Sequence, residues 1–160
     1  DSLALTDHGN LYGAIEFYKK ARAAGIKPIL GVEIYVAPTT RFDKNTNDKY
    51  YHLILLCKNL TGWKNLIQLV TISHLEGYYY KPRVDKNLLR QYQDGLIALS
   101  ACITGEIPKL ILQNNFAGAE KAAREYEEIF ARGDASPSGY RVSNAPDASA
   151  KNSRFREIAN

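Results

Sequence analysis

Short apolar runs alternate with stretches of helical periodicity along the first 131 residues of this sequence. Four apolar runs have the length of buried strands, at 3–7, 28–36, 50–57 and 95–100. Five stretches have the spacing of helices, at 10–24, 61–76, 88–92, 105–113 and 116–131. Connections that contain a helix usually join parallel strands. This order therefore predicts an α/β fold with a largely parallel sheet or barrel, and it excludes a β-sandwich.

Two segments depart from this pattern. Residues 38–49 are polar and rich in turn-forming residues, which predicts an exposed loop. Residues 133–160 are rich in Ser, Ala, Asn and Asp, and Ile158 is their only isoleucine or leucine. Such a segment buries too little surface to offset its ordering entropy. We expect one partial domain over 1–132 and a low-complexity tail over 133–160 that is either disordered or the product of a changed reading frame, and we favour the second origin.

Composition restricts the cellular setting more than the function. No apolar run approaches the ~20 residues that a membrane span requires, and no segment resembles a signal peptide. The two cysteines, Cys57 and Cys102, form no CxxC pair, which favours a reducing, cytoplasmic setting over a disulfide scaffold. A net charge of +4 and 11 tyrosines suit a nucleic-acid partner, but a solvated basic surface explains them equally well.

Side chains capable of metal chemistry lie at or near the predicted strand ends. Asp7 and His8 stand where the first strand gives way to a helix, and Glu33 interrupts an otherwise apolar strand. His52 lies near the start of the third strand, and Cys102 follows the fourth. Parallel α/β folds place their chemistry in the loops at the carboxyl ends of the strands. Two imidazoles, a carboxylate and a thiolate suit Zn²⁺ or Mn²⁺, and the thiolate favours Zn²⁺.

Each of the four candidate ligands also has a purely structural interpretation. His8 can be a hydrogen-bonding residue at a helix start, and Glu33 can pair with a lysine on a neighbouring element. His52 can be a half-buried strand histidine, and Cys102 can be a small apolar residue beneath a helix. The residues alone leave both interpretations open.

The residues around the candidate ligands are open to the same question. Asp7 or Asn10 can cap the helix that follows, with Gly9 only permitting the turn. His74 lies on the predicted helix 61–76 and receives no role from its position. Cys57 is expected to be a core residue.

An ordered series of motifs resembles the PHP (polymerase and histidinol phosphatase) domain family. The series comprises LTDHGN at 5–10, EFY at 16–18, GIKPILGVEIYV at 25–36, RFD at 41–43, YHL at 51–53, GYYYKPRVD at 77–85, GLIALSAC at 95–102 and GEIP at 105–108. The YYKPR and LSAC segments resemble the branch of this family found in bacterial DNA polymerase III alpha subunits. The resemblance runs from residue 1 to about 131 without a large gap.

The resemblance implies a distorted (β/α)7 barrel with a metal cluster at its mouth. Family ligands come from an early His-x-His, a nearby acid, the His of Asp-His-Gly, a Glu, a His, a Cys and a late Asp-x-His. By position this chain supplies four of them, His8, Glu33, His52 and Cys102, with Asp7 as an orienting neighbour rather than a ligand. We expect the early and late ligands, with the first and last strands, to lie outside the sequence given.

The same resemblance implies a function in DNA replication. A parent protein of this branch would be a DNA-directed DNA polymerase, a nucleotidyltransferase that extends a primer with dNTPs through Mg²⁺ in a polymerase domain absent here. Its PHP domain would be a metal-dependent 3′–5′ exonuclease or a structural platform. Expected partners are DNA, the proofreading subunit and the sliding clamp, with no membrane involved.

Two other functions remain as alternatives. One is a free-standing PHP phosphoesterase of the histidinol-phosphatase kind, and the other is an unrelated α/β barrel hydrolase. We expect the isolated fragment to be inactive and poorly soluble, because an incomplete barrel exposes sheet edges and apolar faces.

Overall fold

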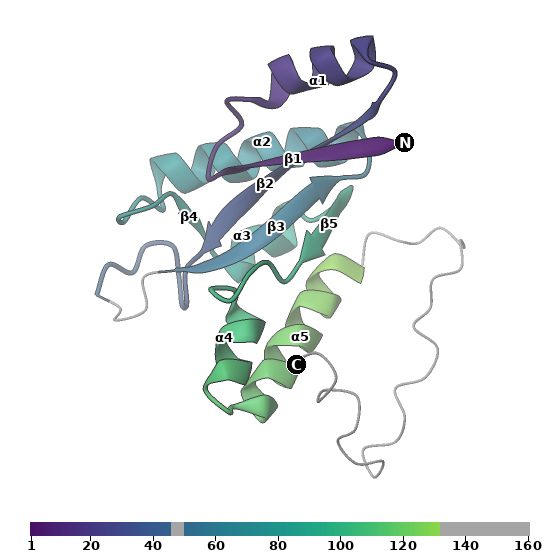
Figure 1. Ribbon diagram of the computed structural model, residues 1–160. Coiled ribbons are helices and arrows are strands. Elements are labelled where there is room, and N and C mark those ends of the chain that lie inside the picture. The colour runs from purple at the N-terminus through teal and green to yellow at the C-terminus, as the bar shows by residue number, and fades with distance from the viewer. Residues whose placement is uncertain (46–49, 132–160) are drawn as a thin grey trace.

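The sheet is built around the ten-residue strand β2 (Lys27–Val36), in the computed structural model that describes residues 1–45 and 50–131. β1 (Ser2–His8) and β4 (Arg83–Val84) both pair with β2 in parallel. β3 (Tyr51–Cys57) pairs with β2 antiparallel, and β5 (Leu96–Leu99) pairs antiparallel with β3. The described strands form an open sheet in the order β1-β2-β3-β5, with β4 beside β2 (Figure 1).

The sheet is mixed, which corrects the prediction of a largely parallel one at β3. Four strands run in one direction and β3 runs against them. The connection from β2 to β3 contains no helix within its described residues. A chain that returns without a crossover helix can pair antiparallel with the strand it has just left. The predicted α/β class is therefore confirmed, while closure into a partial barrel and the tail at 133–160 stay predictions, the tail lying outside the described residues.

Five helices accompany these strands among the described residues: α1 (Ala14–Ala23), α2 (Leu60–Leu75), α3 (Lys86–Tyr92), α4 (Glu106–Leu112) and α5 (Phe116–Ala131). The bounds of the last four agree closely with the sequence periodicity. α1 begins four residues later than predicted, at Ala14, because the Asn10 side chain does not cap it. Asn10 instead accepts a hydrogen bond from Tyr12 N and donates one to His8 O, which makes a turn before the helix.

The core lies on one face of the sheet. Val32, Ile34 and Val36 alternate along β2 and are fully buried, and Leu53 and Leu55 on β3 continue the same face. The helices supply the other half of this cluster through Leu66, Leu69, Leu88, Leu89, Tyr126 and Ile129. Figure 1 shows α2 and α3 behind the sheet. Cys57 packs against this core, where burial raises the pKa of its thiol to about 11, so the prediction of a core cysteine is confirmed.

The opposite face of the sheet carries the polar residues. Since side chains alternate along a strand, Glu33 and His52 point away from the core that Val32 and Leu53 enter. Ile97 and Leu99 of β5 share this opposite face and remain 44% and 46% exposed. This sheet face is the one on which the candidate ligands gather. Among the described helices none is long and apolar enough to span a membrane.

A buried carboxylate, Asp85, joins the start of α3 to the loop after β2. One carboxylate oxygen of Asp85 accepts from Leu88 N at 2.8 Å and so caps α3. The other accepts from Arg41 N and from the Arg41 guanidinium, both at 3.0 Å. Burial alone would raise the pKa of Asp85, but these hydrogen bonds and the positive charge of Arg41 outweigh it and lower the pKa.

This lowered pKa predicts an acid-dependent loss of stability. The Asp85 carboxylate stabilises the fold above its unfolded pKa of about 3.9, and this contribution disappears as the pH falls through the lower folded pKa. We expect Asp85→Asn to cost about 2 kcal/mol at pH 7 and to flatten the stability profile below about pH 4. Urea unfolding of the purified chain between pH 3 and 7, at the low concentration that its expected poor solubility requires, measures both effects through Trp63 fluorescence. Asp94→Asn, at an exposed position, is the control, and an unchanged acid limb in Asp85→Asn would contradict the prediction.

Candidate metal centre

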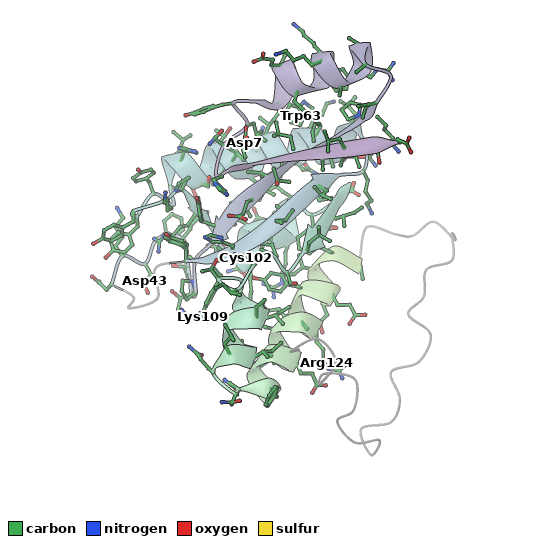
Figure 2. All side chains as sticks on the ribbon, viewed as in Figure 1. Asp7, Asp43, Trp63, Cys102, Lys109 and Arg124 are labelled. Atoms are coloured by element: carbon green, nitrogen blue, oxygen red, sulfur yellow. The ribbon has the colours of Figure 1, made fainter. Side chains whose placement is uncertain are left out.

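The four candidate ligands lie at one edge of the sheet. His8 ends β1, and its register partner on β2 is Glu33. Cys102 follows β5, which runs in the same direction as β1 and β2. His52 lies at the start of β3 rather than at its end, and the reversal of β3 places that start at the same edge. The structure thus brings all four residues, named the candidate centre from here on, to the edge where Figure 2 shows Cys102.

Glu33 is the middle member of the candidate centre. Its Oε1 lies 2.9 Å from His52 Nδ1 and 3.4 Å from His8 Nε2. Cys102 Sγ lies 3.6 Å from the same His52 nitrogen. The Glu33 and His52 side chains are 14% and 19% exposed, whereas the His8 side chain is 72% exposed. The centre therefore has a partly buried inner pair and one imidazole that faces solvent.

These distances test whether a metal ion fits. Tetrahedral zinc, with bonds of about 2.0–2.3 Å, separates neighbouring donor atoms by roughly 3.3–3.6 Å. The His8–Glu33 and His52–Cys102 pairs have such separations, and the donor types suit zinc. The Glu33–His52 pair does not, because its 2.9 Å is a hydrogen-bond distance. Among residues 1–45 and 50–131, however, no group of three or more His, Cys, Asp and Glu side chains is arranged to hold a metal ion. The donor set fits a divalent metal, but these residues by themselves do not enclose one.

Unusual backbone conformations hold two of the candidate ligands in place. Gly9, which follows His8, has a φ of +68° and donates from its N–H to Glu33 O at 2.9 Å. Ala101, which precedes Cys102, has a φ of +61°, a conformation that residues other than glycine and asparagine rarely adopt. Glycine adopts a positive φ freely, so only the Ala101 conformation is strained; strained residues of this kind persist where the surrounding structure enforces them and concentrate at functional sites.

The loop after β5 ties Cys102 to His52 through its backbone. His52 N donates to Thr104 O at 3.2 Å, and Gly105 N donates to Cys102 O at 2.9 Å. The Cys102 thiol also lies 2.8 Å from Thr104 Oγ1. The thiol is therefore fixed relative to the His52 imidazole by contacts on both sides, although Cys102 itself is exposed.

Asp7 contacts the segment that follows His8. Its Oδ2 accepts a hydrogen bond from Gly13 N at 2.8 Å, and Gly13 is the N-cap residue of α1. Asp7 thereby closes the loop between β1 and α1. This contact agrees both with an orienting neighbour of His8 and with a residue that only satisfies the helix start.

Two residues of the site were not identified from the sequence. His74 on α2 has its Nε2 2.9 Å from Gly9 O, so it fixes the turn after His8. The Tyr35 ring lies edge-on to the His52 ring, with centroids 5.3 Å apart. A period of two along β2 places Tyr35 on the same face as Glu33, which could have indicated it. No local pattern marks His74, because its partner is 65 residues away.

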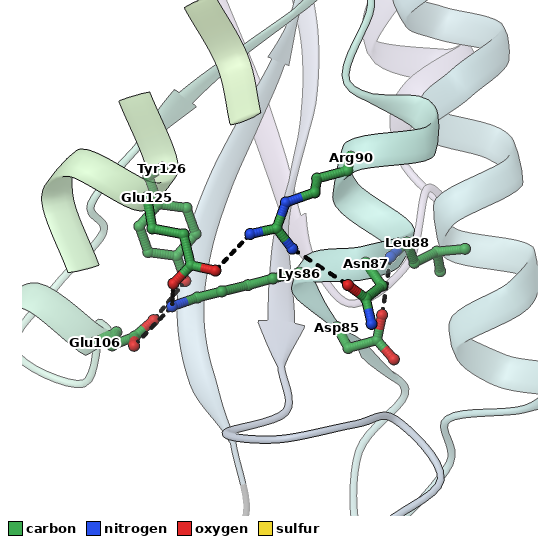
Figure 3. A network of polar contacts seen from close by, with 8 residues as sticks. All are labelled: Asp85, Lys86, Asn87, Leu88, Arg90, Glu106, Glu125 and Tyr126. Carbon is green, nitrogen blue, oxygen red and sulfur yellow. Dashed lines mark hydrogen bonds and ion pairs between the residues drawn. The ribbon is translucent and has the colours of Figure 1, made fainter. Parts of the chain in front are cut away.

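A network of charged groups holds α4, the helix that follows the Cys102 loop, against α3 and α5. Lys86 Nζ lies 2.9 Å from Glu106 Oε1 on α4 and 2.8 Å from Glu125 Oε2 on α5 (Figure 3). Tyr126 donates to the other Glu106 oxygen at 2.9 Å, and Arg90 pairs with Glu125. Burial of Glu125 would raise its pKa, but hydrogen bonds from Lys86 and Arg90 outweigh this and lower the pKa. The network clamps α4 and α5 to α3.

Comparison with known proteins identifies the family of this chain. The sequence profile of the PHP domain matches residues 1–135. The chain is 55% identical over 131 residues to the DNA polymerase III subunit alpha of Borreliella burgdorferi, covering 80% of this chain and 11% of that protein. The corresponding subunit of Thermus aquaticus is 52% identical over 133 residues, covering 81% of this chain and 11% of that protein.

A third relative matches nearly the whole chain. The DNA polymerase III subunit alpha of Aquifex aeolicus is 41% identical over 166 residues, covering 99% of this chain and 14% of that protein. This chain thus spans about a tenth of the length of the curated relatives it matches. The chain belongs to the PHP domain family, and its relatives are alpha subunits of bacterial DNA polymerase III.

Proposed function

We propose that this chain is part of the PHP domain of a bacterial DNA polymerase III alpha subunit, and that its candidate centre serves metal-dependent 3′–5′ hydrolysis of DNA. The observation that carries the proposal is the position of Glu33 Oε1 within 3.4 Å of two imidazoles at one edge of the sheet. A carboxylate shared by two histidines suits a divalent cation. Resemblance to the polymerase branch supplies the DNA substrate.

The chemistry of the site divides between the metal and the side chains. A bound Zn²⁺ or Mn²⁺ would polarise the scissile phosphate and lower the pKa of a water molecule. Glu33, His52 and Cys102 would hold it from the sheet side, and the exposed His8 would reach it from the solvent side. Tyr35 restricts the rotation of the His52 ring, and His74 fixes the turn that carries His8.

The parent protein would then be a replicative enzyme. Its DNA-directed DNA polymerase activity, with dNTPs and Mg²⁺, would belong to a domain absent from this sequence. DNA, a proofreading subunit and a sliding clamp would be its partners, in the cytoplasm. The free-standing phosphoesterase alternative has no support from the relatives described above, which are polymerase subunits.

A structural platform is the second candidate function. It is favoured by one observation, namely that the described part of the chain contains no group of side chains arranged to enclose a metal. In that case Glu33 would serve as a hydrogen-bond partner for the two histidines, and the domain would support other replicase subunits.

Metal content and hydrolysis together distinguish the two functions. The full-length protein is purified without chelator, its bound metals are measured, and digestion of 5′-labelled single-stranded DNA is followed without dNTPs. The exonuclease proposal predicts bound metal, a ladder of products shortened from the 3′ end, loss of that ladder after chelation and its return with Zn²⁺ or Mn²⁺. Metal-free protein that extends primers but does not shorten DNA would establish the structural-platform function instead.

A further inference from the structure

Three exposed aromatic side chains are displayed on two loops beside the candidate centre. Phe42 belongs to the loop after β2, and Tyr78 and Tyr80 belong to the segment between α2 and β4. Their exposed fractions are 59%, 56% and 58%, respectively. Large aromatic side chains this exposed contribute little to the core. A group of them is typical of a surface that binds a ligand or another macromolecule.

A buried arginine holds the two loops together. The Arg83 side chain is fully buried and donates to Arg41 O at 3.2 Å, to Asp43 O at 2.7 Å and to Gly77 O at 3.1 Å. Figure 2 shows Asp43 at the same edge of the sheet as Cys102. The loops are therefore fixed relative to each other before any partner arrives, which reduces the entropy lost on binding.

The backbone at Tyr80 adds to this display. Tyr80 has a φ of +60°, which is an outlier for a bulky aromatic residue. Tyr79 N donates to Lys81 O at 3.0 Å, so Tyr80 stands at the tip of a tight turn. Strained conformations of this kind concentrate where ligands are held.

A short chain of contacts connects this segment to the candidate centre. Lys81 Nζ lies 5.6 Å from the centroid of the Tyr35 ring, and that ring lies 5.3 Å from the His52 ring. On the other side, a Cβ placed on Gly9 would lie 3.1 Å from Pro82 Cγ. The segment between α2 and β4 thus borders Gly9, which follows His8, and Tyr35, whose ring contacts His52.

The charges of the loops favour a polyanion. Lys44 and Lys81 are exposed next to the aromatic residues. The acidic groups of the same loops face cations, since Glu76 pairs with Arg41 at 2.7 Å and the Asp43 carboxylate, which accepts from Thr39 and Asn45, is also attracted by the positive charge of Arg83. Aromatic faces interspersed with lysines are typical of surfaces that bind single-stranded nucleic acid.

We propose that Phe42, Tyr78 and Tyr80 form a stacking platform for the bases of a single DNA strand whose 3′ end enters the candidate centre. The inference rests on the proposed function, which supplies DNA as the substrate. Bases in a paired duplex cannot lay their faces on protein rings, so the platform selects single-stranded ends. Lys44 and Lys81 lie where they can neutralise phosphates of the same strand.

A photocrosslink tests the platform directly in the full-length protein. The probe is an oligo-dT strand with one 5-iodouracil near its 3′ end, irradiated in the presence of chelator so that no hydrolysis occurs. We expect crosslinked peptides to contain Phe42, Tyr78 or Tyr80. The double variant Tyr78→Ala/Tyr80→Ala is expected to lower the yield about tenfold, because stacking on each ring is lost. The corresponding double Tyr→Phe variant keeps both rings and is expected to retain the yield.

Phe116→Ala is the matched control, since Phe116 is 57% exposed at the start of α5 and lies outside the two loops. Crosslinks that map only to other parts of the protein, or a crosslink yield unchanged in the double alanine variant, would overturn the stacking-platform proposal. Loss of affinity for another replicase subunit with an unchanged crosslink would also overturn it, in favour of a protein partner. Crosslinks at these residues in a protein that binds no metal and does not hydrolyse DNA would support the stacking platform and reject the exonuclease proposal.

Discussion

Replacement of Glu33 by glutamine is expected to abolish most chelator-sensitive hydrolysis by the full-length protein, with kcat lowered at least about a hundredfold. Glutamine keeps the shape of the side chain but removes the negative charge that both imidazoles share. Glu33 Oε1 is the atom within 2.9 Å of His52 and 3.4 Å of His8, so one substitution weakens two contacts of the candidate centre. Bound metal, measured on the same protein, should fall with activity.

The control for this variant is Glu16→Gln. Glu16 is an exposed carboxylate on α1 that pairs with Lys20, so its loss should leave hydrolysis and metal content unchanged. Primer extension by the Glu33→Gln protein reports whether the rest of the polymerase is intact. Full hydrolysis in Glu33→Gln, accompanied only by a lower melting temperature, would show that Glu33 is a structural partner of the histidines and not a metal ligand.

The sequence predicted the class of the fold and most element bounds because these depend on local periodicity. The direction of β3 was not predicted, since the residues 38–49 before it carry no signal that distinguishes a return from a crossover. That direction decides where His52 lies. In a fully parallel sheet the start of β3 would be at the edge opposite His8, and the two imidazoles could not share Glu33.

The residues of the candidate centre also fall into two groups: those that the local sequence indicates, and those whose role depends on contacts between distant parts of the chain. His8 and Glu33 stand at strand positions that the sequence already marks as unusual, and the register of β1 on β2 makes them neighbours. His74 and Lys86 contribute through contacts with residues 65 and 20 or more positions away. Side-chain contacts at such separations depend on how helices pack on the sheet, which the pattern of apolar residues does not specify.

Adding a single methyl group at Gly62 is expected to destabilise the fold strongly. Gly62 lies in the first turn of α2, and a Cβ there would overlap the carbonyl oxygen of Gly95 and lie 2.6 Å from its carbonyl carbon. Gly95 cannot retreat easily, because its carbonyl oxygen accepts from Lys58 N at 2.8 Å and its φ is +72°. Gly62→Ala must therefore push α2 away from the turn before β5, at an expected cost of about 3 kcal/mol.

Gly118 provides a matched control for this prediction, because both glycines follow a capping asparagine by three residues. Asn59 Oδ1 accepts from Gly62 N, and Asn115 Oδ1 accepts from Gly118 N, each at 3.0 Å. The three atoms nearest to a Cβ on Gly118 all belong to the Asn115 side chain, which can rotate away, so Gly118→Ala should change stability by less than about 1 kcal/mol. Urea unfolding of the purified chain, at the low concentration that its expected poor solubility requires, measures both variants through Trp63, the only tryptophan, which follows Gly62 and packs against the core. Equal midpoints for the two variants would mean that α2 is free to move off β5, and the close approach of Gly62 to Gly95 would not be a constraint on this fold.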